Sequence, residues 1–260
     1  MSFSRGPFKL DYIALIIGLI LTSSCGPVSS DSQNHLSTKS VEQSKKNRAL
    51  QKDMVALFIQ ARAFDAAAPM AQKLYQEQKD QANPAYWMAV ILREKGVYSE
   101  AEKYFLEAIS KDSKHGPSFD GLGILYGIQG ELKKALVAHQ KATVLEPNNA
   151  KYWNNYGFAL GLNKKLDLAI KAYEKSISLA PQEKRSFVNL AFIFGAQSKY
   201  RKAEHYLSQA LPPAVVFYNL ALIYEKQGKL KESLSYYQKA IHENPDFTKA
   251  QQAIERIRKQ

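Results

Sequence analysis

The side chains that most often carry catalysis or bind metal ions are few in this chain and lie far apart. The histidines are His35, His115, His139, His205 and His242, and the one cysteine is Cys25. Zinc sites place such ligands at short, regular spacing, and no two of these residues have that spacing. A single cysteine also excludes a disulfide within the chain. We therefore expect no metal site and no cofactor.

The other candidates for chemistry have structural explanations. Asp120 and Glu131 are possible paired carboxylates, but nothing in the sequence places them on one face of an element. Gly121 and Gly123 do not form a phosphate-binding loop, because they fall inside a predicted helix. His139 occupies a position that is aromatic or bulky elsewhere in the chain, which favours a packing role. The sequence predicts a protein that is not an enzyme.

A period of 34 residues organises most of the chain. Alanine recurs at this interval at Ala101, Ala135, Ala169 and Ala203. Small residues recur in step with it at Ala89, Gly123, Gly157 and Ala191, and the equivalent small residue of the last unit is Ala221. Large residues follow three positions later at Leu92, Tyr126, Leu160, Phe194 and Tyr224. Small residues let two helices approach closely and large ones fill the space beside them, so the pattern predicts stacked helix pairs.

This pattern resembles the tetratricopeptide repeat. The resemblance implies an all-α solenoid, a right-handed superhelix of antiparallel helix pairs. The expected helices span about 84–95 and 98–111, 117–129 and 131–144, 150–163 and 166–179, 184–197 and 200–211, and 214–227 and 230–243. Gly96, Gly130 and Gly228 stand where the first helix of a pair ends, a common place for glycine, and Lys164 and Ser198 replace it in two units.

The period also defines the expected domain organisation. Residues 46–81 are expected to form a divergent helical repeat, residues 82–245 five repeats, and residues 246–260 a capping helix with one polar face. The interval after the fourth repeat is shorter, because Pro212 and Pro213 stop its second helix early.

Residues 1–24 have the features of a signal peptide. Arg5 and Lys9 precede an apolar run at 12–21, about half the roughly 20 residues that a transmembrane helix needs. The small residues before Cys25 resemble the lipobox of bacterial lipoproteins, which implies acylation of Cys25 and a lipid anchor. The expected location is the cell envelope, at the outer membrane and facing the periplasm. The alternative is an ordinary secretory signal followed by an incidental cysteine.

Composition adds two expectations. Residues 25–45 are rich in polar residues and predict a flexible tether. The net charge of +12 reflects lysines on the turns and second helices. Nucleic acid is one interpretation of a basic protein, but the export signal argues against it. The lysines form either a solvated outer face or a surface for anionic headgroups or the cell wall.

The expected working surface is the inner side of the superhelix, where a groove binds an apolar or amphipathic segment of a protein partner. The residues expected in this groove are Val90, Ile124, Phe158, Phe192, Leu222, Asn155, Asn189 and Asn219. Gly127, Gly161 and Gly195 are expected to leave space beside three of them. The alternative is that these apolar residues only pack against the next repeat, and the asparagines belong to the inter-helix seam.

Part of the chain resembles a narrower family. Residues 153–160 (WNNYGFAL), 189–192 (NLAF), 211–214 (LPPA) and 219–221 (NLA) are similar to TadD-type lipoproteins of Tad (Flp) pilus assembly. The resemblance implies a non-catalytic scaffold at the outer membrane that assists assembly of the pilus or its secretin. The alternatives are a type IV pilotin-like protein, an adaptor for cell-wall (peptidoglycan) enzymes, and a regulatory module of an enzyme complex.

Overall fold

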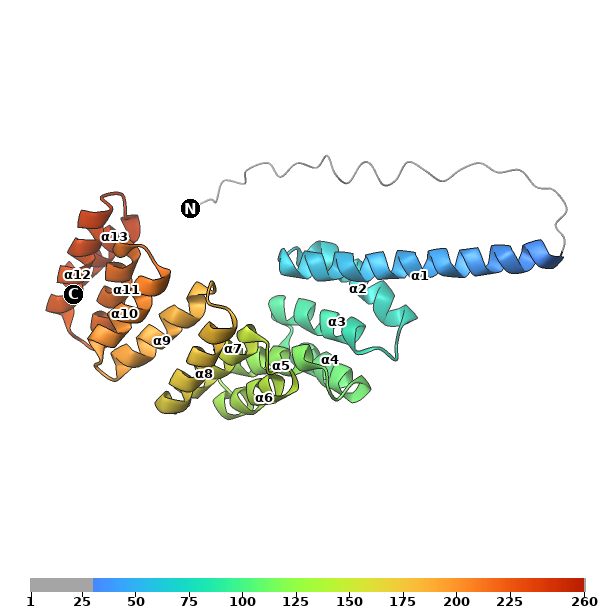
Figure 1. Ribbon diagram of the computed structural model, residues 1–260, viewed down its shortest axis with the longest axis horizontal. Coiled ribbons are helices and arrows are strands. Elements are labelled where there is room, and N and C mark those ends of the chain that lie inside the picture. The colour runs from blue at the N-terminus through green and yellow to red at the C-terminus, as the bar shows by residue number, and fades with distance from the viewer. Residues whose placement is uncertain (1–29, 260) are drawn as a thin grey trace. The chain divides into compact units, whose positions relative to one another are not determined.

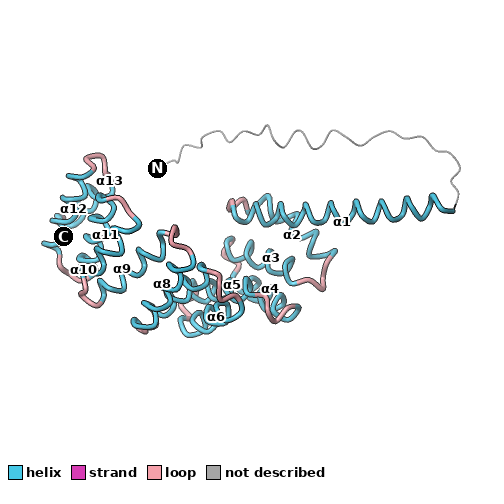
Figure 2. The backbone as a smooth tube through the Cα atoms, in the orientation of Figure 1, coloured by secondary structure: helices cyan, strands magenta, loops and turns pink. Residues whose placement is uncertain are grey.

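The computed structural model describes residues 30–259, and all regular structure in that range is α-helical (Figure 1). The helices are α1 (Ser30–Gln60), α2 (Phe64–Glu77), α3 (Ala82–Glu94), α4 (Tyr98–Lys111), α5 (Gly116–Ile128), α6 (Leu132–Leu145), α7 (Ala150–Leu162), α8 (Leu166–Leu179), α9 (Lys184–Ala196), α10 (Tyr200–Ala210), α11 (Pro213–Lys226), α12 (Leu230–Glu243) and α13 (Thr248–Arg258). Short loops join them (Figure 2). The chain divides into two units, residues 1–50 and 51–260, and the helix pairs lie in the second.

The turn inside each helix pair has one backbone geometry. Gly96, Gly130 and Gly228 have φ of +80°, +77° and +71°. Lys164 and Ser198 have φ of +60° and +58° at the corresponding positions. A left-handed residue after the last helical turn lets the chain reverse direction. The predicted ends of the first helices are therefore confirmed, with glycine replaced in two pairs as the sequence indicated.

Close approach of small and large residues holds each pair together. A Cβ atom on Gly157 would lie 3.0 Å from the ring of Tyr173, which is almost fully buried. The same kind of contact joins successive pairs, because a Cβ on Gly121 of α5 would lie 2.3 Å from the ring of Phe105 of α4. The rings of the second helices therefore pack directly on the backbone of the first helices. The predicted fold, a solenoid of consecutive helix pairs, is confirmed.

The first pair of the second unit follows the same rules despite its divergent sequence. Arg62 has φ of +58° and stands 34 residues before Gly96. Val55, Ala67 and Leu74 are fully buried in one cluster with residues of α3. The end of α1 and helix α2 thus form a pair that packs onto α3.

The C-terminal end of the solenoid also follows the sequence pattern. Helix α10 ends at Ala210, and Pro213 begins α11, so the two prolines shorten the fourth repeat as predicted. Ala250, Ile254 and Ile257 of α13 are buried against α11 and α12. The opposite side of α13 is charged and exposed, which suits a terminal helix.

The structure differs from the prediction at residues 30–45. These residues belong to helix α1, whereas composition predicted a flexible tether. The last glycine and proline before this stretch are Gly26 and Pro27, so no residue in it interrupts a helix. The signal peptide at 1–24 and the acylation of Cys25 lie outside the described residues and stay predictions. None of the described helices is both long and apolar enough to span a membrane.

Candidate binding groove

Two neighbouring cavities lie along helices α5, α7 and α9, each of about 290 Å³. Ile124, Asn155 and Phe158 line the first cavity. Phe158, Asn189 and Phe192 line the second. Five of the eight residues predicted for the groove therefore line two adjacent cavities, which share Phe158 and Leu162.

The lining of these two cavities includes exposed apolar side chains. Phe158 is 55 % exposed, and Leu162, which lines both cavities, is 44 % exposed. A Cβ atom on Gly127 would have no neighbour within 4 Å, so this glycine leaves space in the first cavity. Gly161 lines the second cavity. An exposed phenyl ring flanked by two hollows is a surface that can bind apolar side chains of another molecule.

The other predicted groove residues lie elsewhere. Val90 is only 5 % exposed and packs with residues of α5. Leu222 packs in the cluster that α13 completes. Asn219 donates its amide to the carbonyl of Val215 in its own helix. For Gly195 the expected space is absent, because a Cβ there would lie 2.3 Å from Ile223. For these residues the structure agrees with packing within the stack.

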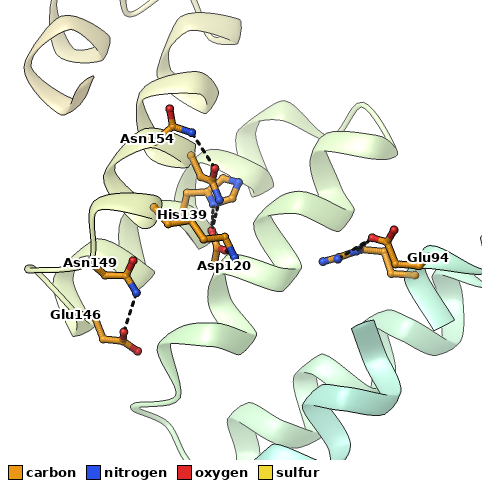
Figure 3. Close-up of polar contacts among 9 residues, drawn as sticks. Glu94, Asp120, His139, Glu146, Asn149 and Asn154 are labelled. Atoms are coloured by element: carbon orange, nitrogen blue, oxygen red, sulfur yellow. Dashed lines mark hydrogen bonds and ion pairs between the residues drawn. The ribbon is translucent and has the colours of Figure 1, made fainter. Parts of the chain in front are cut away.

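A partly buried network of polar side chains connects the two cavities through Asn155 and Asn189, which line them. Asn155 Nδ2 donates to Asp120 Oδ1 at 2.8 Å, and Asn154 Nδ2 donates to Asn155 Oδ1 at 3.2 Å. Asn154 Oδ1 accepts from Asn189 Nδ2 at 3.0 Å and from Ser186 Oγ at 3.2 Å (Figure 3 labels Asp120 and Asn154). These hydrogen bonds thus link α5, α7 and α9, three of the helices that line the two cavities.

Asp120 is the charged residue at one end of this hydrogen-bonded series of side chains. It is 2 % exposed, and its Oδ1 lies 3.0 Å from Nδ1 of His139 on α6 (Figure 3). Its Oδ2 lies 3.2 Å from Nζ of Lys151. Burial by itself raises the pKa of this carboxyl, but His139, Lys151 and Asn155 together lower it below its usual value of 3.8. Asp120 is therefore an ionised structural anchor, and Glu131 is separate from it and pairs with Lys134.

Sequence profiles described as the tetratricopeptide repeat match residues 150–183 and 214–247. The chain contains tetratricopeptide repeats. Both matched segments coincide with helix pairs of the structure, α7 with α8 and α11 with α12. Such repeats are generally non-catalytic scaffolds that bind protein partners. No curated protein matches the chain in sequence.

Solved tetratricopeptide-repeat structures share the fold. PilW, described as a widely conserved type IV pilus biogenesis factor, is 15 % identical, with 80 % of this chain and 98 % of that one covered and a TM-score of 0.66. PilF of Pseudomonas aeruginosa is 17 % identical, with 80 % and 96 % covered and a TM-score of 0.62. YrrB, described as having an unusual peptide-binding site, is 20 % identical, with 70 % and 96 % covered and a TM-score of 0.54.

The sequence did not indicate several residues of the site, including Leu162 and three polar side chains. His139 and Asn163 line the first cavity, and Lys226 lines the second with its Nζ 5.1 Å from the ring centre of Phe192. The signal for His139 was its position: it lies 34 residues before Tyr173 on the face that packs on the first helices. Lys226 gave no signal, because it comes from a helix two pairs beyond Phe158. Among the described side chains, no group of acidic, histidine or cysteine residues could hold a metal ion.

Proposed function

We propose that this protein is a lipid-anchored scaffold whose groove holds an apolar or amphipathic segment of another envelope protein. The observation that carries the proposal is the exposed ring of Phe158 between two cavities. A bound segment would place one apolar side chain in each cavity and cover Phe158 between them. Lys226 at the second cavity would favour a segment with an acidic group near that end.

The process we propose is assembly of a Tad-type pilus or of its secretin at the outer membrane. Two observations support this choice. The short fourth repeat with its Leu211-Pro212-Pro213 ending carries most of the resemblance to TadD-type lipoproteins. PilW, described as a type IV pilus biogenesis factor, and PilF also have structures with this arrangement of helix pairs.

Photo-crosslinking from the groove tests which partner is bound. A photoreactive phenylalanine analogue at position 158, introduced in the native host, should crosslink to a secretin or another pilus-assembly protein. The same analogue at Leu168, an exposed apolar residue of α8 outside both cavities, serves as the control. Crosslinks to a peptidoglycan synthase or hydrolase would instead support an adaptor of cell-wall enzymes. Identical crosslinks from both positions would count against the groove.

A charge placed in the groove tests whether the same surface acts in the cell. Phe158→Glu with Phe192→Glu should reduce surface pili and secretin multimers to the level of the gene deletion, because a carboxylate cannot enter an apolar cavity without a large cost. Leu168→Glu should leave both at the wild-type level. Normal pili and multimers in the deletion strain would exclude the pilus role and leave the groove to another partner.

The lipid anchor has a separate test. Cys25→Ala should abolish labelling by a palmitate analogue and release the protein from the membrane fraction, since acyl chains give about 0.8 kcal/mol per buried methylene. Cys25→Ala protein that is still labelled would contradict the anchor.

A further inference from the structure

A third cavity, of about 510 Å³, opens on the other side of α5. We call it the outer cavity. Its lining residues are Phe119, Leu122, Tyr126, Lys133, Lys134, Val137, Ala138 and Lys141. None of them lines the two groove cavities. Residues 119, 122 and 126 of α5 form one helical face, whereas residues 123, 124 and 127 face the groove.

A small residue creates the outer cavity. Ala138 occupies the position that tyrosine holds in three other repeats, at Tyr104, Tyr206 and Tyr236. The ring of Tyr236 packs against Phe217 and Tyr224, with ring centres 6.2 and 5.1 Å away.

The surroundings of Ala138 keep the aromatic partners of that missing ring. By the repeat register, Phe119 corresponds to Phe217 and Tyr126 to Tyr224. The methyl group of Ala138 cannot extend to these rings as a tyrosine ring does. The outer cavity can therefore accommodate one aromatic side chain, because this repeat has alanine where other repeats have tyrosine.

One other repeat also has alanine at this position, but the surroundings of that alanine differ. Ala172 is the equivalent residue of the next repeat, but Trp153 stands there in place of Phe119. The indole of Trp153 packs against Tyr156 with ring centres 6.3 Å apart. The two alanine positions therefore differ in the aromatic residue that stands beside them.

Lysines surround the mouth of the outer cavity. Helix α6 has no acidic residue, and its exposed side carries Lys133, Lys134 and Lys141 beside Val137, which is 66 % exposed. Lys134 pairs with Glu131 and lies over the ring of Tyr126. Within the described part of the chain, Lys133 and Lys141 have no acidic group within 4 Å. The rim thus favours an anionic ligand.

We propose that the outer cavity binds an aromatic side chain of a partner protein, in a segment with Asp or Glu on either side of that residue. The ring would pack on Phe119 and Tyr126 as the tyrosines of other repeats do, and the carboxylates would pair with Lys133 and Lys141. This second docking surface goes beyond the proposed function, because it is separate from the groove and holds for any partner of that chemistry.

Filling the cavity from within tests the proposal. Ala138→Tyr introduces the residue that three other repeats carry at this position. Twelve-residue peptides from a random display library are selected on the full chain purified in detergent. Sequences with an aromatic residue flanked by Asp or Glu should be enriched on the wild type and not on Ala138→Tyr. The best such peptide, synthesised with a fluorophore, should bind Ala138→Tyr at least tenfold more weakly. Equal binding, or no enrichment of such sequences, would overturn the proposal.

Charge reversal gives a second measurement that does not depend on how Ala138→Tyr folds. The double variant Lys133→Glu with Lys141→Glu should also bind the peptide at least tenfold more weakly, and this effect should be smaller at high salt. Lys171→Glu with Lys175→Glu on α8 is the matched control, and its affinity for the peptide should stay within twofold of the wild-type value. Equal weakening in both double variants would overturn the proposal. Binding of phosphatidylglycerol vesicles that Ala138→Tyr abolishes, with no peptide selected, would assign the cavity to lipid and overturn it too.

Discussion

Asn155 of α7 donates its side-chain amide to the carboxylate of Asp120 in α5, at 2.8 Å. The two residues belong to successive helix pairs and are 35 positions apart. A buried charge of one repeat is therefore satisfied by a side chain of the next. In a solenoid, stability depends on such interfaces between neighbours as much as on each repeat.

Removing this carboxylate should destabilise the middle of the stack. Asp120→Ala leaves His139 and Asn155 without their acceptor in a buried place, which costs about 3 kcal/mol in comparable cases. We expect a lower urea midpoint in circular dichroism and faster hydrogen exchange in α5 to α7. Asp80→Ala, at an exposed aspartate, is the control and should change little. An unchanged midpoint for Asp120→Ala would show that the polar network does not contribute to stability.

The same carboxylate should make stability depend on acid pH. Folding lowers the pKa of Asp120, so the ionised carboxylate stabilises the folded protein. This contribution to the free energy of unfolding is present above pH 3.8, the usual pKa of the group. It is lost as pH falls through the folded pKa. The difference in unfolding free energy between wild type and Asp120→Asn should therefore be smaller at pH 3 than at pH 5. A difference that is constant over this range would contradict the assignment.

The sequence predicted the helix pairs closely because their ends have local causes. Left-handed turns follow the first helices, and Pro212 with Pro213 ends the fourth repeat, so these boundaries needed no knowledge of distant contacts. The helix at residues 30–45 was missed because its polar composition suits both coil and helix.

Of the residues predicted for the groove, only those in the middle of the stack line the two cavities. A sequence period treats equivalent positions alike, but burial depends on the neighbours that each repeat has. Phe158 is exposed, whereas Val90 is covered by α5 and Leu222 packs in the cluster that α13 completes. The link between Asp120 and Asn155 was also out of reach, because it depends on how one pair packs on the next.

Two glycines of α5 should respond to alanine in opposite ways. Gly127→Ala places a methyl group in open space and improves helix propensity, so stability should rise by about 0.5–1 kcal/mol. Gly121→Ala would place its Cβ 2.3 Å from the fully buried ring of Phe105 and should cost about 1–3 kcal/mol. Urea titrations of the two variants measure both values. The same sign for both would contradict the packing described for these two positions of α5.

Introducing glycine in the turn after α7, where other repeats have it, should stabilise the third repeat. Lys164 has φ of +60°, a conformation that costs a residue with a Cβ about 1–2 kcal/mol and glycine nothing comparable. Part of this gain is offset because glycine makes the unfolded chain more flexible. We expect Lys164→Gly to raise the urea midpoint by an amount equivalent to about 0.5–1 kcal/mol. The neighbouring Lys165 has φ of −89°, so Lys165→Gly should lower the midpoint. If both variants shift the midpoint equally, the effect comes from lost lysine charge and not from backbone conformation.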